Sequence, residues 1–258
     1  MNIYYLSEPQ LLVFALVLIR ISAFLVAFPL VESGNIPTSV KILLSMIMAL
    51  VLYPVVNARG IPNDILSGSL FVLVIKEGFM GLFVGFIARF FFQALAVCGD
   101  LVTMSLGLSA DQFFNPHLDR RVTVVEEFEL MIGGLFFLAI NGHHIFIQGL
   151  MQSFDIMPVA KTTLNFVTLR DVSLIAQDII SLGIKLSAPI LGAIFITNIA
   201  MGIVGRAVPQ INVLVMSWPV NIMLGFAILF VSLPLFLMSL KESLNWNAET
   251  LFEILKKL

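Results

Sequence analysis

The chain is a series of long apolar segments separated by short polar stretches. Six apolar segments follow one another, over residues 10–28, 41–56, 65–98, 124–153, 172–205 and 211–240. A membrane-spanning helix needs about 20 mostly apolar residues, which is the scale of these segments. No alternating pattern indicates a β-barrel, and an open sheet cannot satisfy its backbone in lipid. The pattern therefore predicts an all-α membrane protein with about six long apolar helical segments.

Two of the segments, 65–98 and 172–205, do not fit simple spans, because charged residues lie inside them; Asp178 and Lys185 are seven positions apart and share one helical face. Residues 65–98 are too many for one perpendicular crossing. In the segment 124–153, the run Asn141-Gly142-His143-His144 favours a break or kink, with its polar side chains buried against a neighbouring element. We therefore expect several of the helices to be kinked.

The end of the chain has a different pattern. In residues 241–258, apolar side chains recur at steps of three and four, namely Leu244, Ala248, Leu251, Leu255 and Leu258. This spacing predicts a C-terminal amphipathic helix, with Lys and Glu on its other face. Such a helix fits a membrane surface and a partner subunit equally well. We accordingly divide the chain into a polytopic helical domain, 1–240, and an amphipathic helix, 241–258.

The composition supports a membrane protein and excludes other classes. Hydrophobic residues make up 59% of the 258 residues and charged residues 12%, whereas soluble domains are about half apolar and about a quarter charged. The net charge of −2, without a basic run, gives no reason to expect nucleic acid as a partner. Cys98 is the single cysteine, which excludes an internal disulfide and a cysteine-based metal site.

Charged residues inside the apolar segments are the main candidates for a specific role. An unpaired charge at the centre of a bilayer costs about 2.5–3.5 kcal/mol on insertion scales. Such charges are better explained if they pair within the chain or between subunits. The candidates for buried charges or subunit contacts are Arg20, Lys76, Glu77, Arg89, Glu127, Glu129, Asp178, Lys185 and Arg206.

The acidic cluster 126–129 has a local explanation for one member. Thr123 followed by Glu126 matches a capping box, in which the Glu126 side chain accepts a hydrogen bond from the backbone amide of the N-cap residue, Thr123. Glu129 lies about one turn further along and has the reach to contact a cation on another helix. Close helix contact is also predicted by the small residues Gly78, Gly81 and Gly85, and by the pair 133–134.

The polar residues do not have the spacing that a catalytic site or a metal site requires. Ser109 and His143 resemble an intramembrane serine–histidine pair, but a second glycine and a defined oxyanion hole are missing. His143 and His144 as metal ligands would point about 100° apart on a helix, whereas ligand pairs usually lie one turn apart. We therefore predict that the protein is not an enzyme and has no cofactor or metal.

Three stretches resemble the FliR family and its virulence-system relatives. They are "MSLGLSADQFFNP", "LAINGHHIFIQGLMQSFDIMP" and "TNIAMGIVGRAVPQINVLVMSWPVNIMLG". The residues that match the family pattern most specifically are Asn141, Gly142, His143, Pro209, Gln210, Asn212 and Pro219. The chain departs from the pattern at Leu214 and at Ser217-Trp218, where Phe and a Gly-Phe-like pair are expected. The resemblance covers essentially the whole chain and favours the flagellar branch.

The resemblance implies a structural role in protein export. Members of the family are channel-forming subunits of the type III export gate in the bacterial inner membrane, through which unfolded flagellar proteins pass at the flagellar basal body. It implies assembly with FliP-like and FliQ-like subunits into a hetero-oligomer, contact with FlhB-like and FlhA-like export proteins, and passage of exported protein substrates. Helices bent into hairpins would then bury their charges between subunits.

The resemblance also assigns a role to the polar loop 107–121. In the family, the loop after the third segment projects into the channel as part of a plug. The plug residues in this chain would be Gly107, Ser109, Asp111, Phe113, Phe114, Asn115 and Pro116. An aromatic tip on a polar stem suits a channel closure. An ordinary surface loop is the alternative.

A different class of function remains open on the charges alone. An ion-coupled secondary transporter of a small solute would use Asp178, Lys185 and the acidic cluster 126–129. Such a transporter is expected to contain an inverted repeat with matching broken helices, and no such repeat is visible in the sequence.

Overall fold

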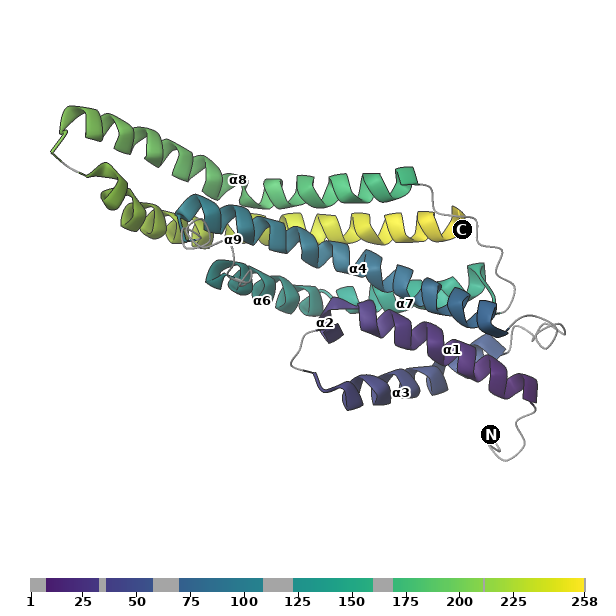
Figure 1. Ribbon diagram of the computed structural model, residues 1–258. Coiled ribbons are helices and arrows are strands. Elements are labelled where there is room, and N and C mark those ends of the chain that lie inside the picture. The colour runs from purple at the N-terminus through teal and green to yellow at the C-terminus, as the bar shows by residue number, and fades with distance from the viewer. Residues whose placement is uncertain are drawn as a thin grey trace. The chain divides into compact units, whose positions relative to one another are not determined.

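The computed structural model describes residues 8–32, 36–57, 70–108, 123–159, 169–210 and 212–257 (Figure 1). Its helices are α1 (Glu8–Ala27), α2 (Pro29–Glu32), α3 (Thr38–Asn57), α4 (Leu70–Leu106), α6 (Val124–Ala139), α7 (Gly142–Ile156), α8 (Leu169–Ala207) and α9 (Val213–Lys257). No strand occurs in these residues. The all-α architecture predicted from the apolar segments is therefore confirmed.

The helices correspond to the predicted apolar segments, but some of their bounds differ from the prediction. The third segment continues as α4 to Leu106, beyond the predicted end at residue 98. The fourth is broken at residues 140–141 into α6 and α7, as the Asn-Gly pair predicted. Among the described residues, five helices are long and apolar enough to cross a membrane, or six if α6 and α7 together form one span.

The chain divides into two compact units. One unit contains residues 1–90, 141–172 and 245–258, and the other contains residues 91–140 and 173–244. The long helices α4 and α9 each contribute to both units, so neither unit corresponds to a continuous stretch of sequence.

The first unit is built on the close approach of α1 to α4. A Cβ atom added at Gly81 would overlap the carbonyl oxygen of Arg20, and one added at Gly85 would lie 2.7 Å from the carbonyl oxygen of Phe24. Only glycine allows the two backbones to come this near, as the small-residue spacing predicted. On another side of α1, helix α3 lies alongside it, with Phe14 and Tyr53 packed edge to face at 5.7 Å (Figure 1).

The second unit packs α6, α8 and α9 around the C-terminal half of α4. Glycines again mark the contacts: Gly99 of α4 faces Glu126 of α6, Gly133 of α6 faces Leu95, Gly183 of α8 faces Val97, and Gly225 of α9 faces Leu106. Helices α8 and α9 follow each other with only residues 208–212 between them (Figure 1). Phe91 and Phe137 fill the interior, with their rings 5.6 Å apart.

The amphipathic end of the chain continues α9 without a break. Helix α9 runs from Val213 to Lys257, so residues 241–257 extend the sixth apolar segment. Leu251 is fully buried, and a Cβ added at Gly149 would lie 2.5 Å from its side chain. The tail thus packs on α7 of its own chain, a contact that neither sequence-based alternative included. The division at residue 240 stays a prediction.

Candidate functional site

The most completely buried polar cluster lies in the first unit and is centred on Arg20. Its Nε donates to Oε2 of Glu77 at 2.5 Å, and both side chains are 0% exposed. The guanidinium carbon also lies 4.2 Å from the centre of the Phe154 ring, a cation–π contact. This buried ion pair brings together, within one chain, two of the charges that the sequence placed inside apolar segments, while Oε1 of Glu77 has no hydrogen-bond partner among the described residues.

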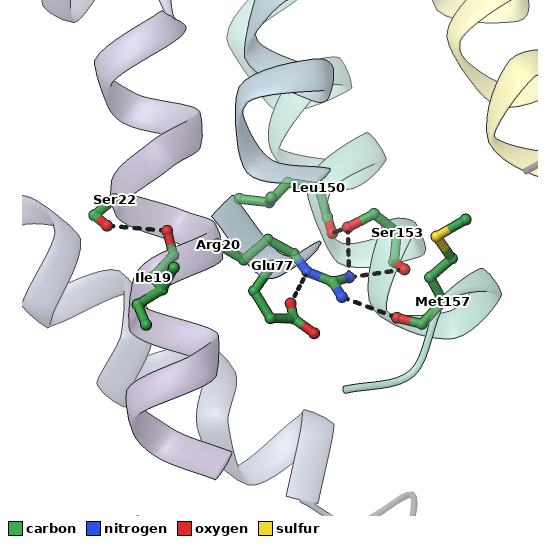
Figure 2. A network of polar contacts seen from close by, with 7 residues as sticks. All are labelled: Ile19, Arg20, Ser22, Glu77, Leu150, Ser153 and Met157. Atoms are coloured by element: carbon green, nitrogen blue, oxygen red, sulfur yellow. Dashed lines mark hydrogen bonds and ion pairs between the residues drawn. The ribbon is translucent and has the colours of Figure 1, made fainter. Parts of the chain in front are cut away.

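The same guanidinium group caps the C-terminal end of helix α7. Nη1 of Arg20 donates to the carbonyl oxygen of Ser153 at 2.9 Å and to its Oγ at 3.2 Å, and Nη2 donates to the carbonyl oxygen of Met157 at 3.0 Å. The last carbonyls of a helix lack partners inside it and carry partial negative charge. Figure 2 shows Arg20 extending from α1 between Glu77 and this end of α7. One side chain therefore joins α1, α4 and α7.

A second acidic position begins helix α6 in the other unit. Thr123 accepts a hydrogen bond from the Glu126 amide at 3.3 Å, and Glu126 Oε2 accepts one from the Thr123 amide at 3.4 Å. This is the capping box that the sequence predicted. Glu126 is 4% exposed and lies against Gly99 of α4, so the cap is also a helix contact. Its role is accordingly structural.

Glu129 lies one turn further along α6 in a different environment. It is 4% exposed, and its Oε2 has no hydrogen-bond partner among the described residues. The Cys98 thiol is within hydrogen-bonding contact of the carboxyl group. Glu129 also lines a groove formed by α6, α8 and α9, in which Ser232 is the other polar side chain.

The remaining predicted charges are less buried in the single chain. Lys76 and Asp178 are half-buried, and Arg89, Glu127, Lys185 and Arg206 are exposed. Side chains that are exposed on an isolated subunit stay accessible to another subunit. Their predicted role in subunit contacts therefore stays a prediction.

The motif at residues 141–143 forms the break between α6 and α7. Asn141 has φ 59° and ψ 29°, a left-handed conformation that asparagine tolerates better than most residues. Gly142 is buried, and the rings of His143 and His144 lie with their centres 4.3 Å apart, tilted by 58° to each other. His143 is half-buried, and its Nδ1 has no partner among the described residues. The motif is thus a structural break with one unsatisfied imidazole nitrogen.

The motif at residues 206–219 turns the chain from α8 into α9. Pro209 and Gln210 form an exposed turn. Asn212 then begins α9, because its Oδ1 accepts a hydrogen bond from the Val215 amide at 3.4 Å. Pro219 lies inside α9 and is exposed. The residues that match the family pattern here therefore shape a hairpin between two long helices.

One polar pair that links those two helices was not predicted from the sequence. Asn221 of α9 donates to Oδ1 of Asn198 of α8 at 3.0 Å, and Asn221 is 6% exposed. The signal was available, because both asparagines interrupt apolar runs and a lipid-facing asparagine would lack a partner. Ser153 was missed for a different reason, since a single serine in a helix carries no such signal.

Most of the predicted plug loop lies outside the described residues. Gly107 is described: it has φ 77° and ends α4, and a Cβ added there would lie 3.4 Å from the Trp218 ring. Ser109, Asp111, Phe113, Phe114, Asn115 and Pro116 are not described, so the plug stays a prediction. Within the described residues, no group of three or more His, Cys, Asp or Glu could hold a metal ion.

Comparison with known proteins identifies the family. The model of the bacterial export proteins, family 1, matches residues 11–245. A flagellar biosynthetic protein FliR of Caulobacter vibrioides is 32% identical over 225 residues, which cover 87% of this chain and 89% of the relative. The protein of the same name in Bacillus subtilis is 28% identical over 245 residues, 94% of either chain, and that of Escherichia coli is 25% identical over 218 residues, 84% and 83%. The chain therefore belongs to the bacterial export proteins of family 1, and within them to the flagellar FliR family.

Proposed function

We propose that this chain is a structural, channel-forming subunit of the flagellar type III protein export gate in the bacterial inner membrane. The observation that carries the proposal is the match to the export family over residues 11–245, together with relatives named as flagellar biosynthetic proteins. In this role the chain helps to build and close the pore through which unfolded flagellar proteins leave the cell. It performs no catalysis and holds no cofactor.

The surface of the second unit supports assembly with other membrane proteins. Phe195 and Ile196 on α8 are 67% and 68% exposed, and Val231 on α9 is 81% exposed. Large exposed apolar surfaces mark contacts with lipid or with other proteins. We infer that FliP-like and FliQ-like subunits cover part of these helices, and that FlhB-like and FlhA-like proteins contact the assembly.

We further propose that residues 107–117 close the channel, with Phe113 and Phe114 as the apolar constriction. Hydrophobic constrictions gate by excluding water, and neighbouring charges such as Asp111 tune what enters. The left-handed Gly107 at the end of α4 supports this role, because it turns the chain out of a long helix at the start of the loop.

Complementation tests the proposed function. The chain is expressed in a flagellated bacterium that lacks its own FliR-family subunit, and the flagellar proteins secreted into the medium are quantified. Restored secretion and swimming support the proposal. If the chain accumulates in the membrane, forms a complex with the host subunits and still restores no secretion, the proposed export function is wrong. A carrier of small solutes would instead restore neither complex nor secretion.

A further inference from the structure

Two asparagine side chains of the second unit meet between helices that are otherwise apolar. Nδ2 of Asn221 on α9 donates to Oδ1 of Asn198 on α8 at 3.0 Å. Asn198 lies inside the stretch Gln177–Ala207 and Asn221 inside Val215–Glu253, and both stretches are long and apolar enough to cross a membrane. The pair therefore places two amide groups in a part of the chain whose other side chains suit an apolar environment.

The one hydrogen bond leaves both amides incompletely satisfied. A side-chain amide has a carbonyl oxygen and two N–H donors. Asn221 is 6% exposed, yet its Oδ1 accepts no hydrogen bond from the described residues. Asn198 is exposed and takes part in the contact through its Oδ1, so its Nδ2 stays available as a donor. The polar contact is thus incomplete in the single chain, and Asn198 is the member that another molecule can reach.

Other polar side chains of α8 are satisfied within their own helix. Oγ1 of Thr197 donates to the Ala193 carbonyl oxygen at 2.9 Å, and Oγ of Ser187 donates to the Ile184 carbonyl oxygen at 3.1 Å. Hydroxyl groups that bond back to the preceding turn need no partner on another helix. The amide of Asn198 differs from them, because the hydrogen bond that it makes goes to another helix and leaves a donor unused.

The surface around Asn198 is apolar and uncovered in the single chain. Phe195, three positions earlier on α8, is 67% exposed, and Ile199 is 51% exposed. Gly202, four positions later, is exposed, and a Cβ added there would meet nothing within 4 Å. Residues three and four positions apart share a face of a helix. Asn198 therefore lies on an apolar face on which a glycine allows another helix to approach closely.

Water and lipid each suit only part of this face. Water would satisfy Nδ2 of Asn198 but leave the apolar side chains of Phe195 and Ile199 unburied. Lipid chains would cover those side chains but offer no acceptor to the amide, which is costly. A membrane helix that carries a hydroxyl or side-chain amide offers both an apolar surface and an acceptor. An ionised carboxylate is a poorer acceptor here, because its charge would face a neutral amide in apolar surroundings.

We propose that the face of α8 centred on Asn198 binds a membrane helix of another export-gate subunit, and that Nδ2 of Asn198 donates a hydrogen bond to a hydroxyl or side-chain amide oxygen of that helix. The proposal rests on the proposed function, since it requires a heteromeric membrane complex. Asn221 holds the Asn198 amide through Oδ1, and Gly202 lets the two backbones come close.

Photo-crosslinking in the assembled complex tests the proposal. Benzoylphenylalanine replaces Phe195, and the chain is expressed together with the other membrane subunits of the gate. We expect the crosslinked peptide to come from a membrane helix of another subunit and to contain Ser, Thr, Asn or Gln. In the Asn198→Leu variant, the yield of this crosslink should fall about threefold or more, because an interhelical hydrogen bond is lost. The matched control Thr197→Val should leave the yield unchanged, since that hydroxyl is already bonded within α8.

A substitution in the partner separates loss of binding from loss of folding. Replacing the polar residue of the crosslinked helix with alanine leaves this chain untouched and should lower the yield as much as Asn198→Leu does. The two substitutions together should lower it no further than either alone, because both remove the same hydrogen bond. The partner's substitution also decides the question if Asn198→Leu prevents assembly.

Three results would overturn the proposal. They are crosslinks only to lipid or to a second copy of this chain, an unchanged yield with Asn198→Leu in a complex of normal composition, and losses that add when the two substitutions are combined. If the wild-type chain forms no heteromeric complex at all, the proposed export function has failed instead.

Discussion

Arg20 and Glu77 lie 57 positions apart in the sequence and form a fully buried ion pair with a distance of 2.5 Å between Nε and Oε2. Because the same guanidinium also binds the two carbonyl groups at the end of α7, the pair orders three helices of the first unit. A buried charge of this kind is stable only with all of its partners present. Removing any one of these partners should therefore lower the stability of the first unit.

The first prediction concerns the acidic partner of this pair. Replacing Glu77 with alanine should destabilise the first unit by about 3–5 kcal/mol, because the Arg20 guanidinium stays buried without a counter-charge. The measurement is the thermal unfolding of the purified protein in detergent. Glu242→Ala is the control, since Glu242 is exposed on α9. Equal midpoints for the two variants would show that the pair does not stabilise the fold.

The second prediction concerns the contact that brings the pair together. Gly81→Ala should cost about 1–3 kcal/mol, because the added Cβ overlaps the Arg20 carbonyl oxygen and one of the two helices must move. Gly192→Ala is a matched control in a helix, since a Cβ added there meets nothing within 4 Å. It should be neutral or slightly stabilising, because alanine favours helix. Comparable destabilisation by both substitutions would contradict the close-approach interpretation.

The helices, the capping box and the break before α7 could be predicted from the sequence, because these features depend on neighbouring residues. Apolar runs gave the helical segments, Thr123 with Glu126 gave the capping box, and Asn141 with Gly142 gave the break before α7. The glycine spacing correctly marked α4 as a helix in close contact. It did not say which helix approaches Gly81.

The pairings between distant elements could not be predicted, because periodicity is local information. Arg20 and Glu77 were both candidates for buried charges, but many other pairings of the same charges were compatible with the sequence. The contact of Leu251 with Gly149 was missed for a related reason, since an amphipathic pattern specifies an apolar face and not what covers it. The continuity of α9 past residue 240 was also missed, because a change in polarity along a helix need not end it.

The third prediction concerns two charged residues of α8, and it distinguishes a loss of subunit assembly from a loss of folding. Lys185 is exposed and Asp178 half-buried, so Lys185→Ala should change the stability of the isolated chain by about 0.5 kcal/mol or less. If another subunit covers these positions, Lys185→Ala and Asp178→Ala should each reduce recovery of the heteromeric complex while the polypeptide stays inserted. The measurement is the amount of partner subunits that co-purify with the chain. Normal assembly of both variants with failure only in transport would contradict a role in subunit contacts.

The fourth prediction concerns the loop that we propose as a plug. Replacing Phe113 and Phe114 together with alanine removes apolar bulk without changing any helix of the described structure. The complex should still form, while its resting conductance to ions and small solutes rises, because a hydrophobic constriction excludes water by its bulk. Conductance is measured across a planar bilayer that contains the purified complex. An unchanged conductance in a fully assembled complex would make the loop an ordinary surface connection.

The most direct measurement is native mass spectrometry of the detergent-solubilised complex, after expression of this chain with FliP-like and FliQ-like subunits. The proposed export-gate role predicts a defined assembly in which this chain is bound to both kinds of subunit, and little of the chain in any other form. A chain recovered alone or as a homo-oligomer, from membranes in which both other subunits are present and inserted, would contradict it.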